Sequence, residues 1–560
     1  MSTTVEPPTQ AGGTPDPRRA DEDVRAAPGR RGALAGAVVG GLALGIAELF
    51  AGLFTSVPSL VTAVGQAFIP NTPGWLKDLA VNLFGTSDKL VLNAGVALTT
   101  LGVAAWAGVL AFRAPAAAGP VLAVLALVGG FAALQDTFAS PVLVALALAC
   151  SIGGGWVALR QLAMVDLERR RHEADADPAR SAGDMAADGG DAAAPTRRAA
   201  SLAGLARRRF LTMTAGIGVA GLATALGGRS LTLARERRFD QVTTSFSLPT
   251  PIRPVALPQP QHSFGLDGIT PIVEASEDFY RIDTALVVPR VDPATWTLRI
   301  TGMVDREIEL TYDDLLNRDL IESYVTLSCV SNEVGGDLVG NARWLGFPLK
   351  ALLEEAGIRD GAEQVVGRAV DGWTAGFPIE VALDGRDAMV AVGMNGERLP
   401  PAHGFPARLV VPGLYGYVSA TKWLTNIELT TWDGFDGYWV PRGWAKEGPI
   451  KTQSRIDVPR PNAQVPVGPT TFGGIAWAVH RGISRVEVRA EGGEWVNAEL
   501  SSPLSDDAWV QWKADIDVPE GWTLVEVRAT DGNGDTQGED YVPPRPDGAE
   551  GYHVIRVRGV

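Results

Sequence analysis

The longest apolar runs lie in the first third of the sequence. Gly32–Phe54 and Leu90–Phe112 each span 23 residues, which is enough for a helix to cross a bilayer core of roughly 30 Å. Pro120–Phe138 and Pro141–Leu159 are two further candidate spans. Such closely spaced runs are not typical of a soluble globular domain. Residues 30–160 are therefore predicted to form a four-helix transmembrane region.

Basic residues indicate the orientation of these helices. Arg30 and Arg31 precede the first run, Arg113 follows the second, and Arg160 follows the fourth. With four spans, all these residues lie on one side, which the positive-inside rule makes cytoplasmic. Residues 1–29 are then a disordered cytoplasmic tail.

Two features depart from a plain apolar bundle. Pro58–Phe84 is interrupted by Pro70 and Pro73, and we expect an external loop with an interfacial helix there; the alternative is a further span. Glu48 lies near the outer end of the first run. It is either a functional carboxylate, for instance at a quinone or proton site, or a carboxylate at the membrane interface.

The predicted bundle is followed by a polar stretch and a further apolar run. Residues 161–205 are rich in Ala, Asp and Gly, as in a flexible cytoplasmic linker. Arg207-Arg-Arg-Phe-Leu211 resembles a twin-arginine export signal; the alternative is a basic stop before an ordinary span. Either interpretation puts a fifth transmembrane helix at 206–229 and all later residues outside. The proline-rich 230–262 is predicted to be a stalk or surface-hugging lead-in.

Beyond the stalk, short strands and helices alternate. Trp296–Gly302 alternates like a strand, Thr311 followed by acidic residues predicts a capped helix, and Leu349–Ala356 has helical spacing. The mixture lacks βαβ regularity, which favours an α+β domain over 263–460. In 461–560, short β-type runs separated by glycine turns predict a β-sandwich of the immunoglobulin-like class. The fold class is thus multi-domain.

Composition excludes several functions. The net charge of −15 argues against nucleic-acid binding. Two cysteines, Cys150 and Cys329, exclude a disulfide framework and a four-cysteine iron–sulfur cluster. No histidine lies in a predicted span, so a bis-histidine haem in the bundle is not expected.

Cys329 is the cysteine outside the membrane-like region. A lone cysteine is inert and buried, or a nucleophile that needs a nearby base such as His403. It can also be one protein ligand of a metal that is held mainly by another group. These alternatives stay open on the residues alone.

Six motifs between about Phe279 and Pro459 resemble the sulfite oxidase family of molybdenum enzymes. The Cys-Ala-Gly-Asn-like loop of the family corresponds to Cys329-Val-Ser-Asn332, and its Phe-x-Arg-Asn-His-like segment to Phe279-Tyr-Arg-Ile-Asp283. The other four are Ala342-Arg-Trp-Leu-Gly346, Met394-Asn-Gly-Glu-Arg-Leu-Pro400, His403-Gly-Phe-Pro-Ala-Arg408 and Thr421-Lys-Trp-Leu424.

The resemblance implies a Mo-molybdopterin cofactor with Cys329 as the metal ligand. Arg408 and Lys422, with His403 as a donor, would hold the pterin phosphate; the alternative for such cations is surface solvation. Arg281 would reach the metal pocket or pair locally with Asp278 or Asp283. The implied cofactor-binding residues are Phe279, Tyr280, Arg281, Asp371, His403, Arg408, Thr421 and Lys422. The candidate catalytic residues are Arg281, Tyr438 and Arg442.

One departure concerns the substrate. Where sulfite oxidases carry two arginines, this chain has Glu333-Val-Gly-Gly336, which weakens anion binding. The resemblance implies two-electron or oxygen-atom transfer to or from a small substrate, with sulfur compounds as candidates. The alternative is a cofactor-free extracytoplasmic binding or adhesion protein.

The expected partners are a quinone or separate cytochrome and the lipid bilayer, without nucleic acid and without haem or iron–sulfur groups in the chain. The C-terminal domain resembles the dimerisation domain of the family, so a homodimer is among the expectations. The expected location is a bacterial cytoplasmic membrane, with the catalytic domain on the extracytoplasmic side.

Overall fold

A computed structural model describes residues 29–72, 83, 88–136, 139–176, 193–244 and 247–560. The chain divides into two compact units, with the boundary between Arg238 and Phe239. Each unit has hydrophobic cores of its own. The predicted tail at 1–29 lies outside the described residues, except for Gly29.

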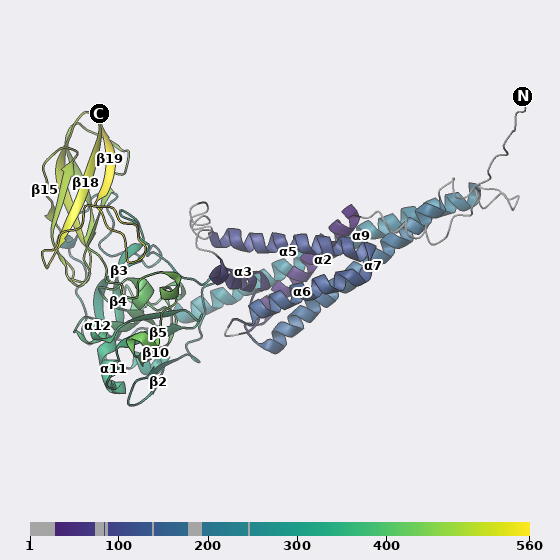
Figure 1. The fold of residues 1–560 in the computed structure, drawn as a ribbon, viewed down its shortest axis with the longest axis horizontal. Helices are drawn as coiled ribbons and strands as arrows, with labels where there is room; N and C mark the ends of the chain where they lie inside the picture. Colours follow the sequence, from purple (N-terminus) through teal and green to yellow (C-terminus); the bar gives the residue numbers. More distant parts are fainter. Residues whose placement is uncertain (1–28, 73–82, 84–87, 137–138, 177–192, 245–246) are drawn as a thin grey trace, which may run out of the picture. The chain divides into compact units, whose positions relative to one another are not determined.

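The first unit is a bundle of α-helices (Figure 1). Among the described residues, four helical stretches are long and apolar enough to cross a membrane, and each matches a predicted span. They are Gly29–Leu53, Leu90–Arg113, Pro141–Asp175 and Arg198–Phe239. The helices are α2 (Gly29–Leu53), α3 (Leu60–Asn71), α5 (Asp88–Arg113), α6 (Pro115–Ala133), α7 (Pro141–Asp175) and α9 (Ala193–Thr244).

The remaining predicted span, Pro120–Phe138, corresponds to α6, which ends five residues earlier, at Ala133. Its 19 residues give a length of about 28 Å, slightly less than a bilayer core of roughly 30 Å. Helix α3 begins at Leu60, in the stretch predicted to contain an interfacial helix. Ala63 of α3 and Ala132 of α6 belong to one small core.

Helix α2 is packed closely on α5 and α9 because glycines line both contacts. A Cβ on Gly36 would lie 2.1 Å from the Ala104 carbonyl oxygen of α5. A Cβ on Gly45 would lie 2.3 Å from the Gly221 carbonyl oxygen of α9. Small residues at these positions let the helix backbones approach closely, which is the usual basis of helix association in membranes.

The flexible linker predicted for 161–205 is mostly helical where the structure describes it, since α7 and α9 include its two ends. Residues 177–192 lie outside the described residues. Asp166 is fully buried and forms ion pairs with Arg169 and Arg170, three and four residues further along α7. Such pairs stabilise a helix beyond the end of its apolar run, which the composition of the stretch did not reveal.

The predicted stalk at 230–262 also begins as helix, up to Thr244 in α9. Its later part follows the surface of the second unit, as the lead-in alternative predicted. The Ile252 amide donates to the Leu320 carbonyl at 2.8 Å, and the Tyr324 hydroxyl donates to the Ala256 carbonyl at 3.1 Å.

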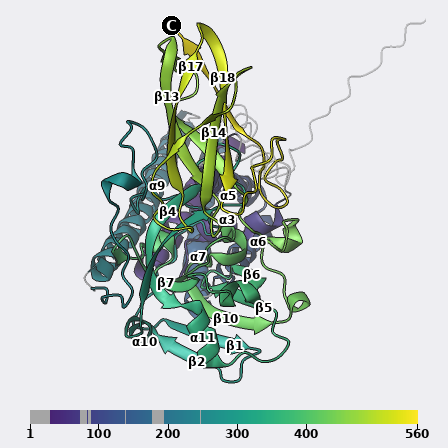
Figure 2. The same cartoon turned by 90° about the vertical axis from the view of Figure 1, so that its left-hand side faces the viewer.

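The α+β part of the second unit contains two sheets over one large core (Figure 2). One sheet has the strand order β2-β1-β10-β5-β6, and the other has β3-β4-β7-β8 with β9 paired to β7. The strands are β1 (Thr297–Gly302), β2 (Ile308–Thr311), β3 (Ile321–Ser328), β4 (Val339–Pro348), β5 (Gln364–Ala369), β6 (Thr374–Pro378), β7 (Met389–Met394), β8 (Glu397–Arg398), β9 (Arg408–Val410) and β10 (Leu424–Thr430). The helices are α10 (Tyr312–Leu316), α11 (Leu349–Ala356), α12 (Ile379–Leu383) and α13 (Gly416–Ser419).

The local signals predicted here are confirmed. Thr311 caps α10 through a reciprocal capping box with Asp314, as its position before acidic residues indicated. Helix α11 ends at Gly357, whose φ of 76° is a backbone conformation that glycine adopts without strain.

The C-terminal part of the second unit has two further sheets, ordered β11-β13-β17-β16 and β12-β19-β18-β14-β15, around a common core (Figure 2). Two sheets with one core fit the predicted sandwich, whereas its immunoglobulin-like class stays a prediction. Strand β11 pairs with β13 and precedes the predicted boundary at 461. The strands are β11 (Gln453–Val458), β12 (Gln464–Val465), β13 (Gly468–Trp477), β14 (Ile483–Ala490), β15 (Val496–Asn497), β16 (Glu499–Leu500), β17 (Val510–Val518), β18 (Gly521–Asp531) and β19 (His553–Gly559).

Candidate molybdopterin site

Cys329 directly follows the fully buried strand β3. Its amide donates to the Leu338 carbonyl at 2.9 Å, and its carbonyl accepts from the Asn332 amide at 3.0 Å. The Asn332 side chain accepts from the Leu338 amide at 2.8 Å. The cysteine is therefore held in a tight turn between β3 and β4.

The Cys329 sulfur lies 2.9 Å from the Ser331 hydroxyl oxygen. Burial raises the pKa of the Cys329 thiol, and hydrogen bonding from Ser331 opposes that rise. Burial also raises the pKa of the Tyr280 and Tyr415 hydroxyls, and negative charge at Cys329 adds to both shifts. Two neutral phenols therefore lie within electrostatic range of the sulfur.

The loop after Cys329 is in contact with the C-terminal sheets. The Tyr541 hydroxyl donates to the Glu333 carboxylate at 2.8 Å. A Cβ on Gly335 would lie 2.2 Å from the Cδ2 atom of His553 in β19. Only a residue without a side chain allows the imidazole ring to approach the loop this closely.

An aromatic cluster surrounds Phe279, which is buried. Its ring stacks on Tyr280, with ring centroids 5.3 Å apart. It meets Trp344 and His403 edge to face at 5.7 Å and 5.6 Å. The segment that resembles the Phe-x-Arg-Asn-His motif thus lies beside the motifs of β4 and of the His403 loop.

His403 is 5% exposed, and its Nε2 donates to the Ser276 carbonyl at 2.7 Å. Burial, followed by the positive charge of Arg408, lowers the His403 pKa to about 4. The neutral ring has one N–H group, and Ser276 takes it. In this arrangement the His403 ring supports the segment around Ser276, and its role as a donor to a phosphate stays a prediction.

Arg408 is a buried cation, only 5% exposed. Its Nη1 donates to the His403 carbonyl at 3.1 Å, and its guanidinium lies over the Trp344 ring at 5.0 Å. Burial lowers its pKa to about 10. Among the described residues, no carboxylate forms an ion pair with Arg408. Since a buried charge without a counter-ion is costly, this arginine fits the anionic phosphate of a pterin.

Lys422 and Arg281 both bind Asp283, whose side chain is 4% exposed. Lys422 Nζ lies 2.9 Å from Asp283 Oδ2, and Arg281 Nε lies 3.0 Å from the same oxygen. The local ion pair considered for Arg281 is thus formed. Burial lowers the Lys422 pKa to about 8, although the negative charge of Asp283 raises it. Burial raises the pKa of Asp371, with a further contribution from Asp283.

Gly404 brings two of these groups together. A Cβ on Gly404 would lie 3.1 Å from both the Arg408 Cβ and the Lys422 Cα. Thr421 has a different place: its hydroxyl is buried, and a Cβ on Gly367 would lie 2.4 Å from it. The Thr421 side chain therefore packs against the sheet that contains β5.

Tyr438 and Arg442 form a separate group. The Arg442 guanidinium lies over the Tyr438 ring at 3.7 Å, and the Tyr438 amide donates to the Thr374 carbonyl at 3.0 Å. No contact within the described part of the chain joins either residue to Cys329. The structure thus brings Arg408 and Lys422 close to Gly404, whereas the catalytic role of Tyr438 and Arg442 stays a prediction.

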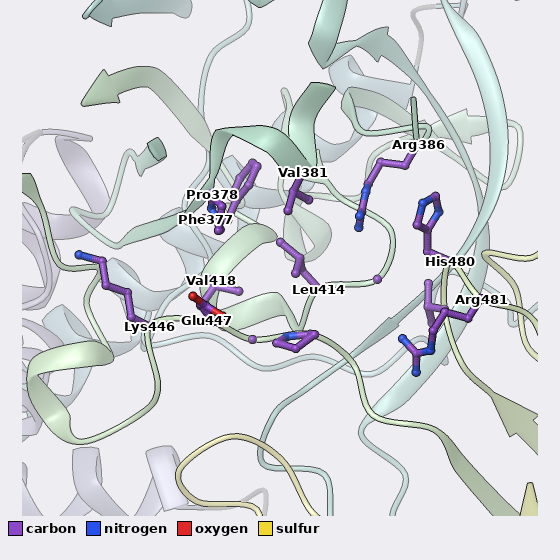
Figure 3. Close-up of a pocket in the computed structure, with 14 residues that line it drawn as sticks. Phe377, Pro378, Val381, Arg386, Leu414, Val418, Lys446, Glu447, His480 and Arg481 are labelled. Atoms are coloured by element: carbon purple, nitrogen blue, oxygen red, sulfur yellow. The ribbon is translucent and has the colours of Figure 1, made fainter. Parts of the chain in front are cut away.

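A cavity of about 320 Å³ lies elsewhere in the second unit (Figure 3). Phe377, Val381 and Leu414 line it from the α+β part, and His480 and Arg481 from the C-terminal part. None of the predicted site residues lines this cavity.

Comparisons with known proteins match the α+β part to a known domain family. Residues 285–439 match the model of the oxidoreductase molybdopterin binding domain. Sulfite oxidase from Gallus gallus is 30% identical over 312 residues, covering 46% of this chain and 66% of that protein. Mitochondrial sulfite oxidase from Mus musculus is 29% identical, with coverage of 46% and 56%. NADH nitrate reductase from Solanum lycopersicum is 28% identical, with coverage of 46% and 35%.

The chain thus spans 35% to 66% of the length of these relatives. Among solved structures, the sulfane dehydrogenase SoxCD from Paracoccus pantotrophus aligns with a TM-score of 0.46 at 22% sequence identity. That alignment covers 57% of this chain and 90% of the SoxCD chain.

Proposed function

Because the chain belongs to the sulfite oxidase family of molybdenum-dependent oxidoreductases, we propose that it is a membrane-anchored enzyme for two-electron or oxygen-atom transfer on a small substrate. The family model and the relatives imply a Mo-molybdopterin cofactor. The observation that carries the proposal is Arg408, a buried cation with no carboxylate partner among the described residues, in the domain that holds Cys329. Negative charge at Cys329 raises the pKa of Tyr280 and positive charge at Arg408 lowers it, so the fields of both residues act on the same phenol.

Different residues of the site would hold different parts of the cofactor. In this proposal the Cys329 thiolate ligates molybdenum, and Arg408 and Lys422 neutralise the pterin phosphate. Asp283 and Asp371 supply carboxylates for the N–H groups of the pterin ring. The bound cofactor supplies the two-electron chemistry, while the protein binds and orients it.

We further propose a substrate that is neutral or only weakly charged, with small sulfur compounds as candidates. Glu333 takes the place of a cation in the family and accepts a hydrogen bond from Tyr541. Arg281 is partly neutralised by Asp283. Tyr280 and Tyr415 stay uncharged because burial raises the pKa of each hydroxyl. These features together attract anions less than a site with free arginines.

The proposed location is a bacterial cytoplasmic membrane, with the catalytic domain on the extracytoplasmic side. The four long apolar helices support a membrane anchor. Electrons would be exchanged with a quinone or a separate cytochrome. The C-terminal domain would belong to the immunoglobulin-like class and pair two copies of the chain, as expected from the resemblance.

Metal and pterin analysis of the detergent-purified protein tests this function. We expect about one molybdenum and one pterin per chain after expression in a pterin-competent host. Cys329→Ser should abolish activity and leave the protein folded, because a hydroxyl is a poor substitute for a soft thiolate ligand. Cys150→Ser is the matched control, because Cys150 is exposed in α7.

Two results would contradict the proposal. Activity that survives Cys329→Ser would remove the cysteine from the metal. Folded wild-type protein without molybdenum or pterin would favour the cofactor-free binding protein.

A further inference from the structure

Among the described residues, one side-chain hydroxyl lies within hydrogen-bonding distance of the Cys329 sulfur, that of Ser331 at 2.9 Å. The turn closed by the Asn332 amide and the Cys329 carbonyl places Ser331 two residues after the cysteine. The Asn332 side chain fixes the turn through the Leu338 amide. These bonds fix the backbone of the turn from which the Ser331 side chain extends.

The direction of this hydrogen bond follows from the state of the sulfur. In a free thiol, either atom is able to donate. A thiolate bound to a metal has no proton, whereas the serine hydroxyl still carries one. Once Cys329 is a metal ligand, the bond runs only from the Ser331 hydroxyl to the sulfur. A bond to a charged acceptor is stronger than one between neutral groups.

Ser331 also departs from the family. The corresponding loop in the sulfite oxidase family is Cys-Ala-Gly-Asn-like, and here it is Cys329-Val-Ser-Asn332. Glycine has no side chain to donate, so the hydroxyl is a feature of this chain and not of the motif.

We propose that the Ser331 hydroxyl donates to the metal-bound sulfur of Cys329 and raises the reduction potential of the molybdenum centre. Hydrogen bonds to sulfur ligands tune metal potentials. A donor withdraws electron density from the sulfur, which then stabilises the oxidised metal less. Ser331 is thus a positioning and tuning residue, and the inference rests on the proposed function.

The test is a redox titration of the purified holoprotein, followed by the electron paramagnetic resonance signal of pentavalent molybdenum. Ser331→Ala is expected to lower the potential of the centre, because the donor is lost. Ser331→Gly restores the glycine of the family motif and is expected to lower the potential in the same direction. Ser331→Thr retains a hydroxyl and should return the potential towards that of the wild-type protein.

Ser328→Ala is the matched control. The Ser328 hydroxyl lies 3.5 Å from the Cys329 carbonyl oxygen and forms no bond to the sulfur, so this change should leave the potential unaltered. Equal reduction potentials in wild-type, Ser331→Ala and Ser331→Gly proteins with full molybdenum content would overturn the inference but not the proposed function. Absence of molybdenum from the wild-type protein would overturn the proposed function, and the inference with it.

Discussion

At the scale of single residues, burial sets the charge of the site as much as residue type does. Desolvation keeps His403 neutral by lowering its pKa to about 4. It also lowers the Lys422 pKa to about 8, although Asp283 opposes that shift. The same effect raises the Glu274 pKa to about 7. Groups of three different types therefore have pKa values displaced from those of their solvent-exposed counterparts.

His403 makes the stability of the second unit depend on pH. Its folded pKa of about 4 lies below an unfolded value of about 6.5. Between these pH values the unfolded chain binds more protons, so stability falls as pH decreases through this window. The wild-type protein should lose up to about 3 kcal/mol relative to His403→Gln between pH 7 and pH 4.

The measurement is chemical denaturation of both full-length proteins in detergent across this pH range. Because both carry Glu274 and every other titrating group, only the difference between them is informative. A difference that does not change with pH would show that folding leaves the proton affinity of His403 unaltered.

Sequence motifs predicted some of the residues that lie close together, but not how they pair. Arg408 and Lys422 lie close together because Gly404 lies between them, as the shared motifs indicated. Asp283 was predicted only as a local ion-pair partner of Arg281. Its bond to Lys422 joins residues 139 positions apart, a distance that no local pattern reports. The partner of the single N–H group of His403 is likewise remote in sequence, because it is the Ser276 carbonyl.

At the scale of elements, apolar periodicity predicted the membrane-type helices but not their ends. The apolar run predicts the first part of α7. Its extension to Asp175 depends on ion pairs such as that of Asp166 with Arg170. The contacts between helices depend on individual glycines. Gly36 and Gly45 lie in one continuous run with other small residues, and only the fold distinguishes those that touch a neighbour.

Gly36→Ala should weaken the contact between α2 and α5. Its methyl group would lie 2.1 Å from the Ala104 carbonyl oxygen, so the helices must separate, at a cost of about 1–3 kcal/mol. Gly41→Ala in the same helix meets no atom within 4 Å and should gain up to about 1 kcal/mol from helix propensity.

Thermal unfolding midpoints in detergent compare the two variants directly. We expect a lower midpoint for Gly36→Ala and an unchanged or higher one for Gly41→Ala. Equal midpoints would show that the close approach of α2 and α5 does not limit stability.

At the scale of the whole molecule, the number of crossings decides which side the catalytic domain faces. The described part of the chain has four helical stretches of full spanning length and the shorter α6, of 19 residues. Five crossings put residues beyond α9 opposite the N-terminal tail, whereas four return them to the same side. The sequence suggested five spans, and length alone does not assign α6 to the membrane.

We expect five crossings, and fusions of reporter proteins test this. Alkaline phosphatase is active only outside the cytoplasm, and green fluorescent protein exported unfolded does not fluoresce. A fusion after Pro249 should give phosphatase activity, and a fusion after Asp175 should give fluorescence. Absence of phosphatase activity from the Pro249 fusion, together with protection of the residues beyond Pro249 from protease added to intact spheroplasts, would contradict the proposed side of the catalytic domain.

The contact between Gly335 and the His553 ring has a consequence for biosynthesis. The ribosome adds His553 more than two hundred residues after Cys329, so the cysteine loop lacks part of its support until strand β19 has been synthesised. Stable insertion of the cofactor therefore follows synthesis of strand β19. A nascent chain stalled before this strand should carry the cysteine yet retain the cofactor poorly.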